Sequence, residues 1–438
     1  MPGGDAGLVS EAVARSTAPL SGVRVIEVGR FAAGPACAAI LADWGADVIK
    51  IEPPGGDPAR GQGVIDSAAN NHGSAPRVNP RFEVHNRSRR SVVLDLRVPA
   101  GRAVAGRLIA AADVLVTNLS PPALRALDLD PPALRARCPR LIVAQVTGYD
   151  PGSQQADERS YDHGAYWSYS GAASLFTGRD GQPPQPAGGF GDRAAGSVLA
   201  GAVAAALLAR ERTGAGSHVT TSLVSTGMWL MASDVSDVLA TGRAQRTSDR
   251  RQAPVPTVNC FRTSDARWLW LQVMETGRDW PRLVAALGAP WLDEDPRFRG
   301  GDVARLRANR GALIELLDEL FRVRPLAEWA DRLAEHQVIW APVRTLEEAV
   351  SDEATQSGAA VVRFDDEFGR CHVTVNSPVL FDGATPRAAT RAPEAGEDTL
   401  EVLALAGLSD REVSELGQAG ALGPTAGAAV DPAASITA

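Results

Sequence analysis

The first half of the chain alternates short apolar runs with stretches in which apolar residues recur every three or four positions. Residues 23–28 and 47–52 are apolar runs rich in β-branched residues, which is typical of buried strands, and residues 34–44 between them follow a helical period. The alternation continues through strand-like 91–96, helix-like 101–112, strand-like 113–117 and strand-like 140–146. This order predicts an α/β domain whose largely parallel sheet is covered by helices.

A long uncharged apolar stretch lies between Arg193 and Arg210. It is shorter than the roughly 20 apolar residues that a membrane helix needs, so the sequence predicts a buried helix and no membrane span. After it, residues 213–216 supply a helix stop, and a largely helical passage is expected to continue to about residue 240. The start of the chain has no basic region followed by an apolar one, so no signal peptide is expected.

The alternation of strands and helices breaks after residue 240. A polar, proline-containing passage at 241–256 is followed by a strand-like segment at 268–273 and helical patterns at 279–287, 303–321 and 326–336. We therefore expect a large α/β domain over 20–225, a linker and smaller domain over 226–340, and a return to the large domain over 341–417. The segments 1–19 and 418–438 are expected to be a flexible and a disordered tail.

Composition narrows the classes of function. The 438 residues carry 44 basic and 52 acidic side chains, a net charge of −8, which argues against nucleic acid as a partner. The four cysteines are far apart, which indicates neither a zinc ribbon nor a disulfide scaffold and favours a cytoplasmic protein. Lys50 is the one lysine, so chemistry that needs a titrating amine has a single candidate.

Two glycine-containing segments could take part in ligand binding. The turn at 29–35 joins a strand to a helix, where backbone N–H groups can receive a phosphate, although glycines there also serve close packing. Asp192 comes directly before the long apolar helix, so it could be an N-cap, and composition favours that reading. Its neighbours Gly188, Gly189 and Gly191 leave space for another molecule, so it could also be a nucleophile.

Three other polar residues remain open. Asp162 and His163 could form an acid/base pair, but adjacent residues point in different directions, so the sequence favours a solvated or packed histidine. Glu275 follows the strand at 268–273, where it could lie on a loop surface or in the wall of a site.

Many segments together resemble the family III CoA-transferases, which include formyl-CoA transferase, carnitine CoA-transferase and 2-methylacyl-CoA racemase. The segments are PLSGVRVIEVGRFAAGP, LADWGADVIKIEPPGGDPAR, NRSRRSVVLDLR, ADVLVTNLSPPALRALDL, PRLIVAQVTGY, GGFGDRAAG, RTGAGSHV, and SPVLF followed by APEAGEDT. They extend from about residue 19 to 417. Each segment alone is weak, but their order and spacing are specific.

The resemblance implies a Rossmann-like large domain with a parallel sheet, a smaller α+β domain, and two chains interlocked as a homodimer. It also implies that Asp192 is the catalytic nucleophile, which reverses the preference for a cap. The expected reaction moves CoA from an acyl-CoA to a carboxylic acid through an aspartyl mixed anhydride and an aspartyl-CoA thioester. No metal or tightly bound cofactor is expected, because CoA enters as part of the substrate. Helix N–H groups beside Asp192 are expected to stabilise the oxyanion.

The resemblance also assigns residues to CoA. The helix start at Ala32, Ala33 and Gly34 is expected next to the nucleotide. The remaining expected contacts are Leu94 and Arg97 for the adenine and phosphates, Asn118 and Leu119 for the pantetheine, and Arg159 in place of a lysine.

The chain departs from the family pattern at several positions. Ala126 and Pro53 stand where the formyl-CoA branch has arginines, and Pro122 replaces a common glycine, so the CoA pose is expected to differ. The run DHGAYWSYSG at 162–171 is one residue longer and more aromatic than usual, which predicts a differently lined acyl pocket. Residues 247–259 lack the tetraglycine loop of the formyl-CoA branch, so neither oxalate nor formate is expected.

Two alternatives to transfer remain. Asp162 and Glu275 align with acidic residues of the racemase, which would make the chain a 2-methylacyl-CoA racemase, although no histidine lies between His85 and Asp162. The aromatic run and the missing arginine would also suit a non-catalytic subunit that binds CoA esters. The intact Asp192 in its glycine setting favours transfer.

Overall fold

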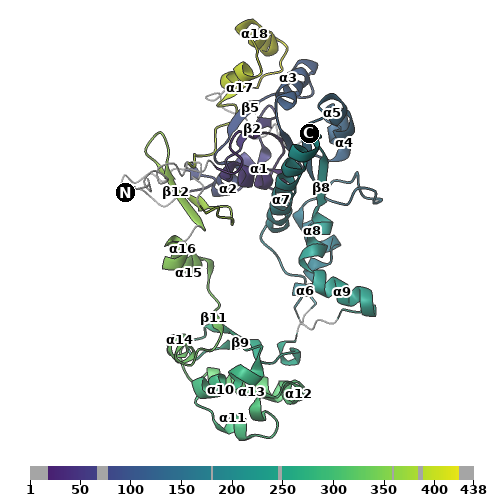
Figure 1. Ribbon diagram of the computed structural model, residues 1–438. Helices are drawn as coiled ribbons and strands as arrows, with labels where there is room; N and C mark the ends of the chain where they lie inside the picture. Colours follow the sequence, from purple (N-terminus) through teal and green to yellow (C-terminus); the bar gives the residue numbers. More distant parts are fainter. Residues whose placement is uncertain are drawn as a thin grey trace, which may run out of the picture. The chain divides into compact units, whose positions relative to one another are not determined.

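The computed structural model describes residues 18–66, 77–178, 181–244, 249–357, 360–382 and 388–423 (Figure 1). They fall into two compact units. The first takes in the described residues of Met1–Ser174, Gln185–Ala232 and Gln356–Ala438, and the second those of Leu175–Pro184 and Ser233–Thr355. The second unit thus includes a short earlier segment, Leu175–Pro184, and its main part ends at Thr355, beyond the expected end at residue 340.

The first unit is built on a six-stranded parallel sheet with the order β5-β2-β1-β6-β7-β8. The strands are β1 (Arg24–Val28), β2 (Asp47–Glu52), β5 (Arg90–Val93), β6 (Val114–Thr117), β7 (Ile142–Thr147) and β8 (His218–Ser222). Numbered along the sheet, this is the 3-2-1-4-5-6 order of the doubly wound dinucleotide-binding fold. The expected α/β class with a parallel sheet is confirmed.

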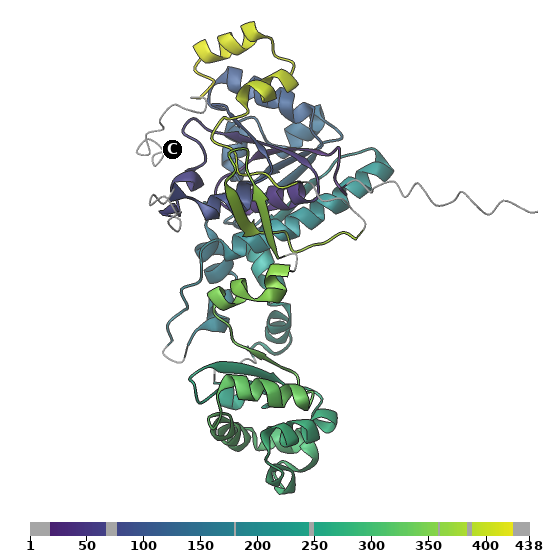
Figure 2. The same ribbon diagram turned by 90° about the vertical axis from the view of Figure 1, so that its left-hand side faces the viewer.

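Helices cover both faces of the sheet because the strands alternate their apolar side chains. In β6, Val114 and Val116 join the core beneath α1 (Ala33–Asp43) and α7 (Phe190–Thr213), whereas Leu115 joins the opposite core. That second core packs against α3 (Pro99–Ala110), α4 (Pro121–Ala126), α5 (Pro131–Arg137), α17 (Thr399–Leu405) and α18 (Asp410–Gln418). Figure 2 shows the long α7 lying along α1.

The long helix α7 has 24 residues, more than the apolar stretch suggested, so the length argument against a membrane span was wrong. Among the described residues it is the one helix long and apolar enough to cross a membrane. Its residues Ala195, Leu199 and Val203 are nonetheless fully buried in the core shared with α1 and the sheet. One face of the helix is therefore buried, as expected, whereas Val198 and Leu208 on other positions are exposed.

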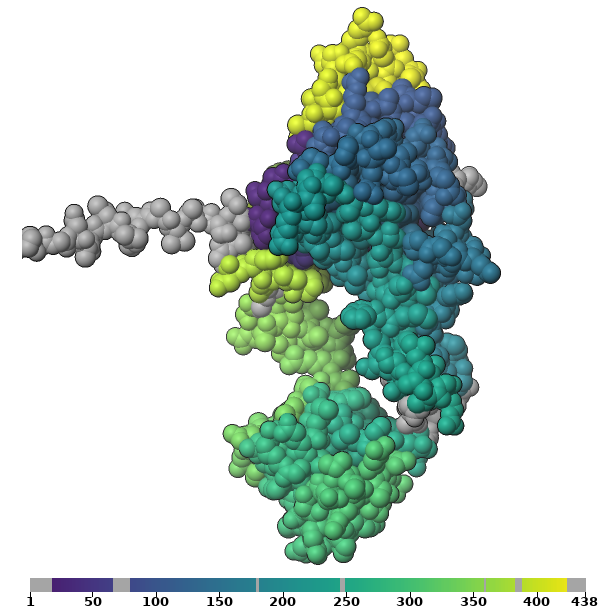
Figure 3. Space-filling view, turned by 45° about the vertical axis from the view of Figure 1, so that its right-hand side comes forward, coloured from purple at the N-terminus to yellow at the C-terminus, as the bar shows by residue number. Residues whose placement is uncertain are grey.

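Several segments differ from the sequence-based expectations. Strand β8 lies inside the passage expected to be helical, because its mixed run HVTTS gains its order only from pairing with β7. The expected disordered tail begins too early, since Ala421 is fully buried and Leu422 pairs with Leu94. In the space-filling view the two C-terminal helices cover the segment around α3 (Figure 3). Residues 1–17 and 424–438 lie outside the described residues.

The second unit combines a three-stranded antiparallel sheet, in the order β11-β10-β9, with helices around a separate core. Strand β11 (Trp340–Pro342) pairs with β10, so the return to the large domain begins later than residue 341. The segment 303–321 forms two helices broken at Asn309. The elements are β9 (Val258–Arg262), β10 (Trp268–Gln272), α9 (Ala232–Thr241), α10 (Thr276–Leu287), α11 (Trp291–Glu294), α12 (Val303–Ala308), α13 (Arg310–Phe321), α14 (Leu326–Glu335) and α15 (Leu346–Ser351).

Shorter elements complete the first unit. They are the hairpins β3 (Ile65–Asp66) with β4 (Arg77–Val78) and β12 (Val361–Asp365) with β13 (Cys371–Val375), the helices α2 (Pro80–Asn86), α6 (Ala172–Phe176), α8 (Leu223–Leu230) and α16 (Glu353–Ser357), and a π-helix at His163–Tyr169. Helix α6 spans the boundary between the two units, and α16 lies at the second boundary.

Candidate active site

The strand order reverses between β1 and β6, because their crossovers leave toward opposite faces of the sheet. In such sheets ligands bind beyond the carboxyl ends of the strands at this point. Here the loops that follow β1 and β6 are joined by one side chain. The Asn118 amide accepts a hydrogen bond from Arg30 N at 2.9 Å and donates to Arg30 O at 2.8 Å. Gly29 and Gly34 fit against this amide, since a Cβ there would lie 3.1 Å and 3.3 Å from Asn118 Oδ1.

The turn after β1 is held in an unusual conformation. Phe31 has a φ of 62°, which non-glycine residues seldom adopt. Its N–H donates to Asp57 Oδ1 at 3.2 Å, and its ring meets the Tyr161 ring edge-on at 5.9 Å. The resulting turn presents the start of α1, where Ala32 is the N-cap and makes no side-chain capping bond.

A buried charge network supports this turn. Lys50 Nζ lies 2.7 Å from Glu27 and 2.9 Å from Asp57, and it donates to Gly29 O at 3.2 Å. Burial alone would lower the pKa of Lys50, but the carboxylates of Glu27 and Asp57 outweigh it and raise the pKa. Arg89 also pairs with Glu27. The single lysine is therefore a fixed cation that holds the turn, and not a titrating amine.

The start of α7 lies against the start of α1. Gly189 is the N-cap of α7 with a φ of 76°, and a Cβ on it would lie 3.6 Å from the Ala32 Cβ. About two turns later, a Cβ on Gly196 would lie 2.8 Å from Ala33 O, so a glycine is required for this close approach. Asp192 occupies the third position inside the helix. The alternative that Asp192 is the N-cap was therefore wrong.

Another carboxylate receives the first turn of α7. The Asp162 side chain is 3% exposed, and its Oδ1 accepts a hydrogen bond from Gly191 N at 2.9 Å. Burial raises the pKa of Asp162, whereas the backbone N–H groups of Gly191, Gly189 and Phe190 lower it in part. The amide of Gly191 is thus occupied, so the expectation that the first turn of this helix offers its N–H groups to an oxyanion does not hold for this amide.

The Asp192 carboxylate itself is half-buried and weakly compensated. Burial and the nearby charge of Asp162 raise its pKa to about 6, while Arg193 and His163 oppose the rise. Among the residues that the structure describes, no side chain hydrogen bonds to this carboxylate. A carboxylate that is ionised at neutral pH but not stabilised by partners is basic and available for reaction.

Aromatic side chains cluster around the first residue of α7. Phe190, two residues before Asp192, contacts the rings of Trp167 at 5.5 Å and Tyr166 at 6.2 Å. Both come from the π-helix, in which Ser170 N bonds to Ala165 O, five residues back. One additional residue in a helix produces such a turn, which matches the longer run seen in the sequence.

The structure brings some of the expected CoA contacts together and separates others. Ala32, Ala33, Gly34, Asn118 and Leu119 meet at the point where the strand order reverses.

The other three lie on different loops, after β5 and after β7. The Leu94 side chain is fully buried, and its N–H bonds to Glu52 O, so it has no side-chain surface for a base. Arg97 follows β5, and its exposed guanidinium pairs with Asp95. Arg159 is exposed on the loop after β7.

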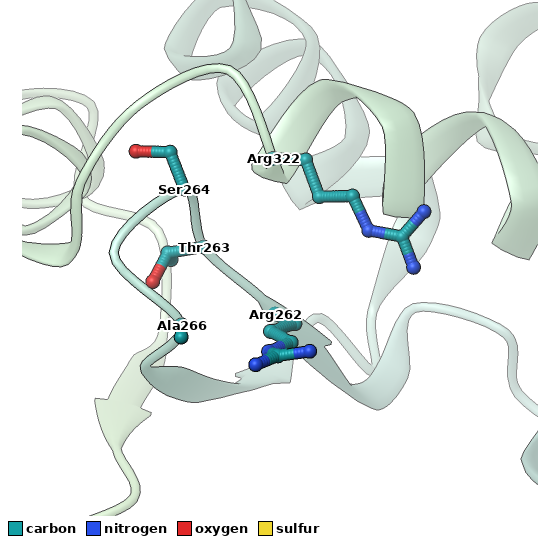
Figure 4. Close-up of a pocket in the computed structure, with 5 residues that line it drawn as sticks. All are labelled: Arg262, Thr263, Ser264, Ala266 and Arg322. Atoms are coloured by element: carbon teal, nitrogen blue, oxygen red, sulfur yellow. The ribbon is translucent and has the colours of Figure 1, made fainter.

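In the second unit, Glu275 pairs with Arg278 at 2.7 Å and is 69% exposed. A pocket of about 360 Å³ in this unit is lined by Arg262, Thr263, Ser264, Ala266 and Arg322, with Arg262 from β9 and Arg322 from the end of α13 (Figure 4). It contains none of the expected site residues. Within the described part of the chain, no cluster of three His, Cys, Asp or Glu side chains is arranged to hold a metal ion.

Two functional features could not be found from sequence. Asp57 lies in the glycine- and proline-rich stretch after β2, and nothing in its spacing indicates that it binds Phe31, 26 residues earlier. Asp162 was singled out for acid/base chemistry, but its role as the partner of Gly191 depends on a contact across 29 residues. The unusual density of glycines before Asp192 was the only local signal of a close approach.

Comparisons with known proteins show the family of the chain. The family model described as CoA-transferase family III matches residues 20–399. The chain is 28% identical over 396 residues to the (R)-2-hydroxy-4-methylpentanoate CoA-transferase of Clostridioides difficile, covering 90% of this chain and 97% of the relative. It is 27% identical over 407 residues to the cinnamoyl-CoA:phenyllactate CoA-transferase of Clostridium sporogenes, covering 92% and 96%.

A solved structure of a CaiB/BaiF family protein from Brucella suis matches with a TM-score of 0.76 and 27% identity, covering 89% of this chain and all of that one. The family model spans most of the chain, and the fold and the long relatives support it. The chain therefore belongs to CoA-transferase family III and is an enzyme of that class.

Proposed function

We propose that the protein transfers CoA from an acyl-CoA to a carboxylic acid with Asp192 as the nucleophile. The observation that carries the proposal is the state of this carboxylate. It is half-buried at the start of α7, beside the reversal of the strand order, and its pKa is raised to about 6. Relatives that span nearly the same length are named as CoA-transferases, which supports the reaction class.

The proposed reaction balances without a further reagent. An Asp192 oxygen attacks the thioester carbonyl carbon, a C–O bond forms, and the C–S bond breaks with its electron pair leaving on the CoA thiolate. The thiolate then attacks the Asp192 carbonyl of the mixed anhydride, which releases the donor acid as a carboxylate. The acceptor carboxylate attacks the aspartyl-CoA thioester, which breaks the C–S bond, expels the thiolate again and forms a second mixed anhydride. The thiolate then attacks the acceptor carbonyl of this anhydride, and the C–O bond to Asp192 breaks, which gives the new CoA ester and restores free Asp192.

The CoA moiety is proposed to lie along the carboxyl ends of the parallel strands. The open N-terminus of α1 at Ala32, which makes no side-chain capping bond, suits the nucleotide phosphates, and Asn118 fixes the turn that presents it. Arg97 and Arg159 are exposed guanidiniums on loops beyond the strands and could add charge to the same ligand.

We also propose that two chains interlock as a cytoplasmic homodimer. The resemblance to the family supports this assembly. On α8, Met228, Trp229 and Leu230 are 45%, 72% and 55% exposed, and exposed neighbouring apolar side chains of this size are typical of a protein interface. Sedimentation equilibrium should give twice the mass of one chain, and a monomer at micromolar concentration would contradict the assembly.

One incubation in D2O tests the reaction. The protein is mixed with a panel of acyl-CoAs and free acids, including arylacyl-CoAs because of the aromatic cluster, and mass spectrometry follows new CoA esters and α-deuterium. New esters are expected with the wild type and with Asp410→Asn, which removes an exposed carboxylate on α18, but not with Asp192→Asn.

Other outcomes would redirect the assignment. Incorporation of α-deuterium without new esters would indicate a racemase. The geometry does not favour this reaction, because Asp162 is buried and accepts a hydrogen bond from a backbone amide. Binding of CoA esters without turnover, unchanged in Asp192→Asn, would indicate a non-catalytic binding subunit.

A second test concerns the CoA contacts. Arg97→Ala and Arg159→Ala should each raise the KM for the CoA ester about 3- to 10-fold while leaving kcat nearly unchanged, because one exposed charge contributes roughly 1 kcal/mol to binding. The matched control is Arg411→Ala, an arginine that is 88% exposed on α18. A KM that stays at the wild-type value in both variants would remove these residues from the CoA site.

A further inference from the structure

Asp162 is a buried carboxylate that the proposed reaction does not use. It precedes the π-helix, is 3% exposed, and its Oδ1 accepts the hydrogen bond from Gly191 N at 2.9 Å. Its other oxygen, Oδ2, is buried and has no hydrogen-bond partner among the described residues. A buried carboxylate with one unsatisfied oxygen is costly, so its retention calls for a reason beyond packing.

The contact between Asp162 and the start of α7 is sterically demanding. A Cβ on Gly191 would lie 2.4 Å from Asp162 Oδ1 and 2.2 Å from Cγ of Tyr166. Only a glycine therefore lets the carboxylate reach this backbone amide. The close approach of both Asp162 and Tyr166 thus explains the glycine next to Asp192.

This arrangement determines which carboxylate lies at the positive end of the α7 dipole. An anion at a helix N-terminus is stabilised by the free N–H groups and the helix dipole. Asp162 occupies that place through Gly191. Asp192, inside the same turn, lies near the charge of Asp162, which raises its pKa, while Arg193 and His163 offset part of this rise. His163 and Tyr166 are the other titratable groups that interact with Asp162, while Ala32 and Ala33 on α1 carry no charge.

We propose that Asp162 is a positioning residue for CoA transfer. It accepts the hydrogen bond from the amide at the start of α7 and leaves the Asp192 carboxylate without a hydrogen-bonding partner, so that Asp192 attacks the acyl-CoA as an anion. The proposal rests on the proposed function of Asp192. In every covalent intermediate Asp192 is neutral, so its repulsion by Asp162 is relieved when the first anhydride forms and returns when free Asp192 is restored. Asp162 thereby favours formation of the covalent intermediates without touching substrate.

The test separates charge from structure at this position. Asp162→Asn keeps an oxygen that can accept from Gly191 N but removes the charge, whereas Asp162→Ala removes both. Asp150→Asn is the matched control, because Asp150 accepts from Ser222 and Ser225 at the start of α8 and is not among the charges that act on Asp192. All variants are full-length and are compared by thermal unfolding and by the pH profile of kcat/KM.

The pH profile should distinguish the roles. The wild type is expected to lose kcat/KM below about pH 6 as Asp192 is protonated. In Asp162→Asn this acid limb should move down by about one pH unit, and the plateau should fall about 10-fold, because the pKa of Asp192 drops when the neighbouring charge is removed. Asp150→Asn should leave the acid limb unchanged. An unmoved acid limb in a well-folded Asp162→Asn would overturn the proposal.

A measurement without turnover keeps the two proposals distinct. Carbodiimide coupling of glycine ethyl ester to Asp192, followed by peptide mass spectrometry across pH, reports the protonation of this side chain directly. If the wild type transfers no CoA but the pH midpoint of coupling is lower in Asp162→Asn than in the wild type, the proposed function is rejected and the electrostatic role of Asp162 is kept. Equal midpoints in the wild type and in Asp162→Asn would reject that role even if CoA transfer is observed.

Discussion

Replacing Lys50 by methionine should unfold the first unit far more readily than a change at an exposed ion pair. Lys50 is fully buried in β2 and lies within 3 Å of both Glu27 and Asp57. Methionine keeps most of the apolar stem but removes the ammonium. Arg89 still pairs with Glu27, whereas Asp57 loses its cation in the low-dielectric interior.

The magnitude follows from burial. Removing one partner of a buried ion pair costs about 3 to 5 kcal/mol, because an uncompensated charge remains inside the protein. For a unit of this size that corresponds to a fall in Tm of roughly 10 °C. The matched control is Arg24→Met, which breaks the pair between β1 and β2 formed by Arg24 and Asp47, whose side chains are 34% and 33% exposed. That change should cost about 1 kcal/mol or less.

The assay is differential scanning calorimetry of the ligand-free protein, together with the KM for a CoA ester. The KM should rise in Lys50→Met, because Lys50 binds Gly29 O and Asp57 holds the backbone of Phe31, so the turn before α1 loosens. If Lys50→Met melts within about 2 °C of Arg24→Met, the energetic reasoning is refuted. If it is destabilised but keeps the wild-type KM, the link between the charge network and the binding turn is wrong.

Three further predictions concern packing, thiol chemistry and pH. Gly196→Ala should lower the Tm and the activity because its Cβ would lie 2.8 Å from α1, whereas Gly201→Ala, with open space around it, should raise the Tm slightly; equal effects would contradict the close helix contact. Cys371 is exposed and should react with iodoacetamide in the native state, whereas Cys37, whose pKa is raised by burial, should react only after unfolding, as peptide mass spectrometry can show. Burial opposes the ionisation of Glu52, but the hydrogen bond and charge of Arg60 hold its pKa at about 2. The stability that ionised Glu52 contributes is therefore present above pH 4.5 and should be lost toward pH 2. Chemical unfolding should show Glu52→Gln less stable than the wild type by about 3 kcal/mol at pH 7 and nearly equal to it near pH 2.

Local patterns were sufficient for the alternating elements of the sheet. The period of apolar residues predicted β1, α1, β2 and the long helix α7 within a few residues, because that period reflects which face of each element is buried. The pattern failed for β8, whose run HVTTS is mixed and is ordered by its pairing with β7. It also failed to place the end of the ordered chain, since Leu422 pairs with Leu94 across more than 300 residues.

The candidate nucleophile shows the same division. The glycines around Asp192 indicated an unusual turn, but only the resemblance to a family singled out the aspartate, because a helix cap and a nucleophile look alike in one sequence. The sequence by itself determined the fold class and the family. The tertiary structure decided that Gly189 is the cap, that Asp162 takes the amide of Gly191, and that Lys50 is a fixed cation. The contacts of Asp162 with Gly191 and of Lys50 with Glu27 join residues 29 and 23 positions apart, and the electrostatics of a carboxylate depend on such neighbours, which no local pattern encodes.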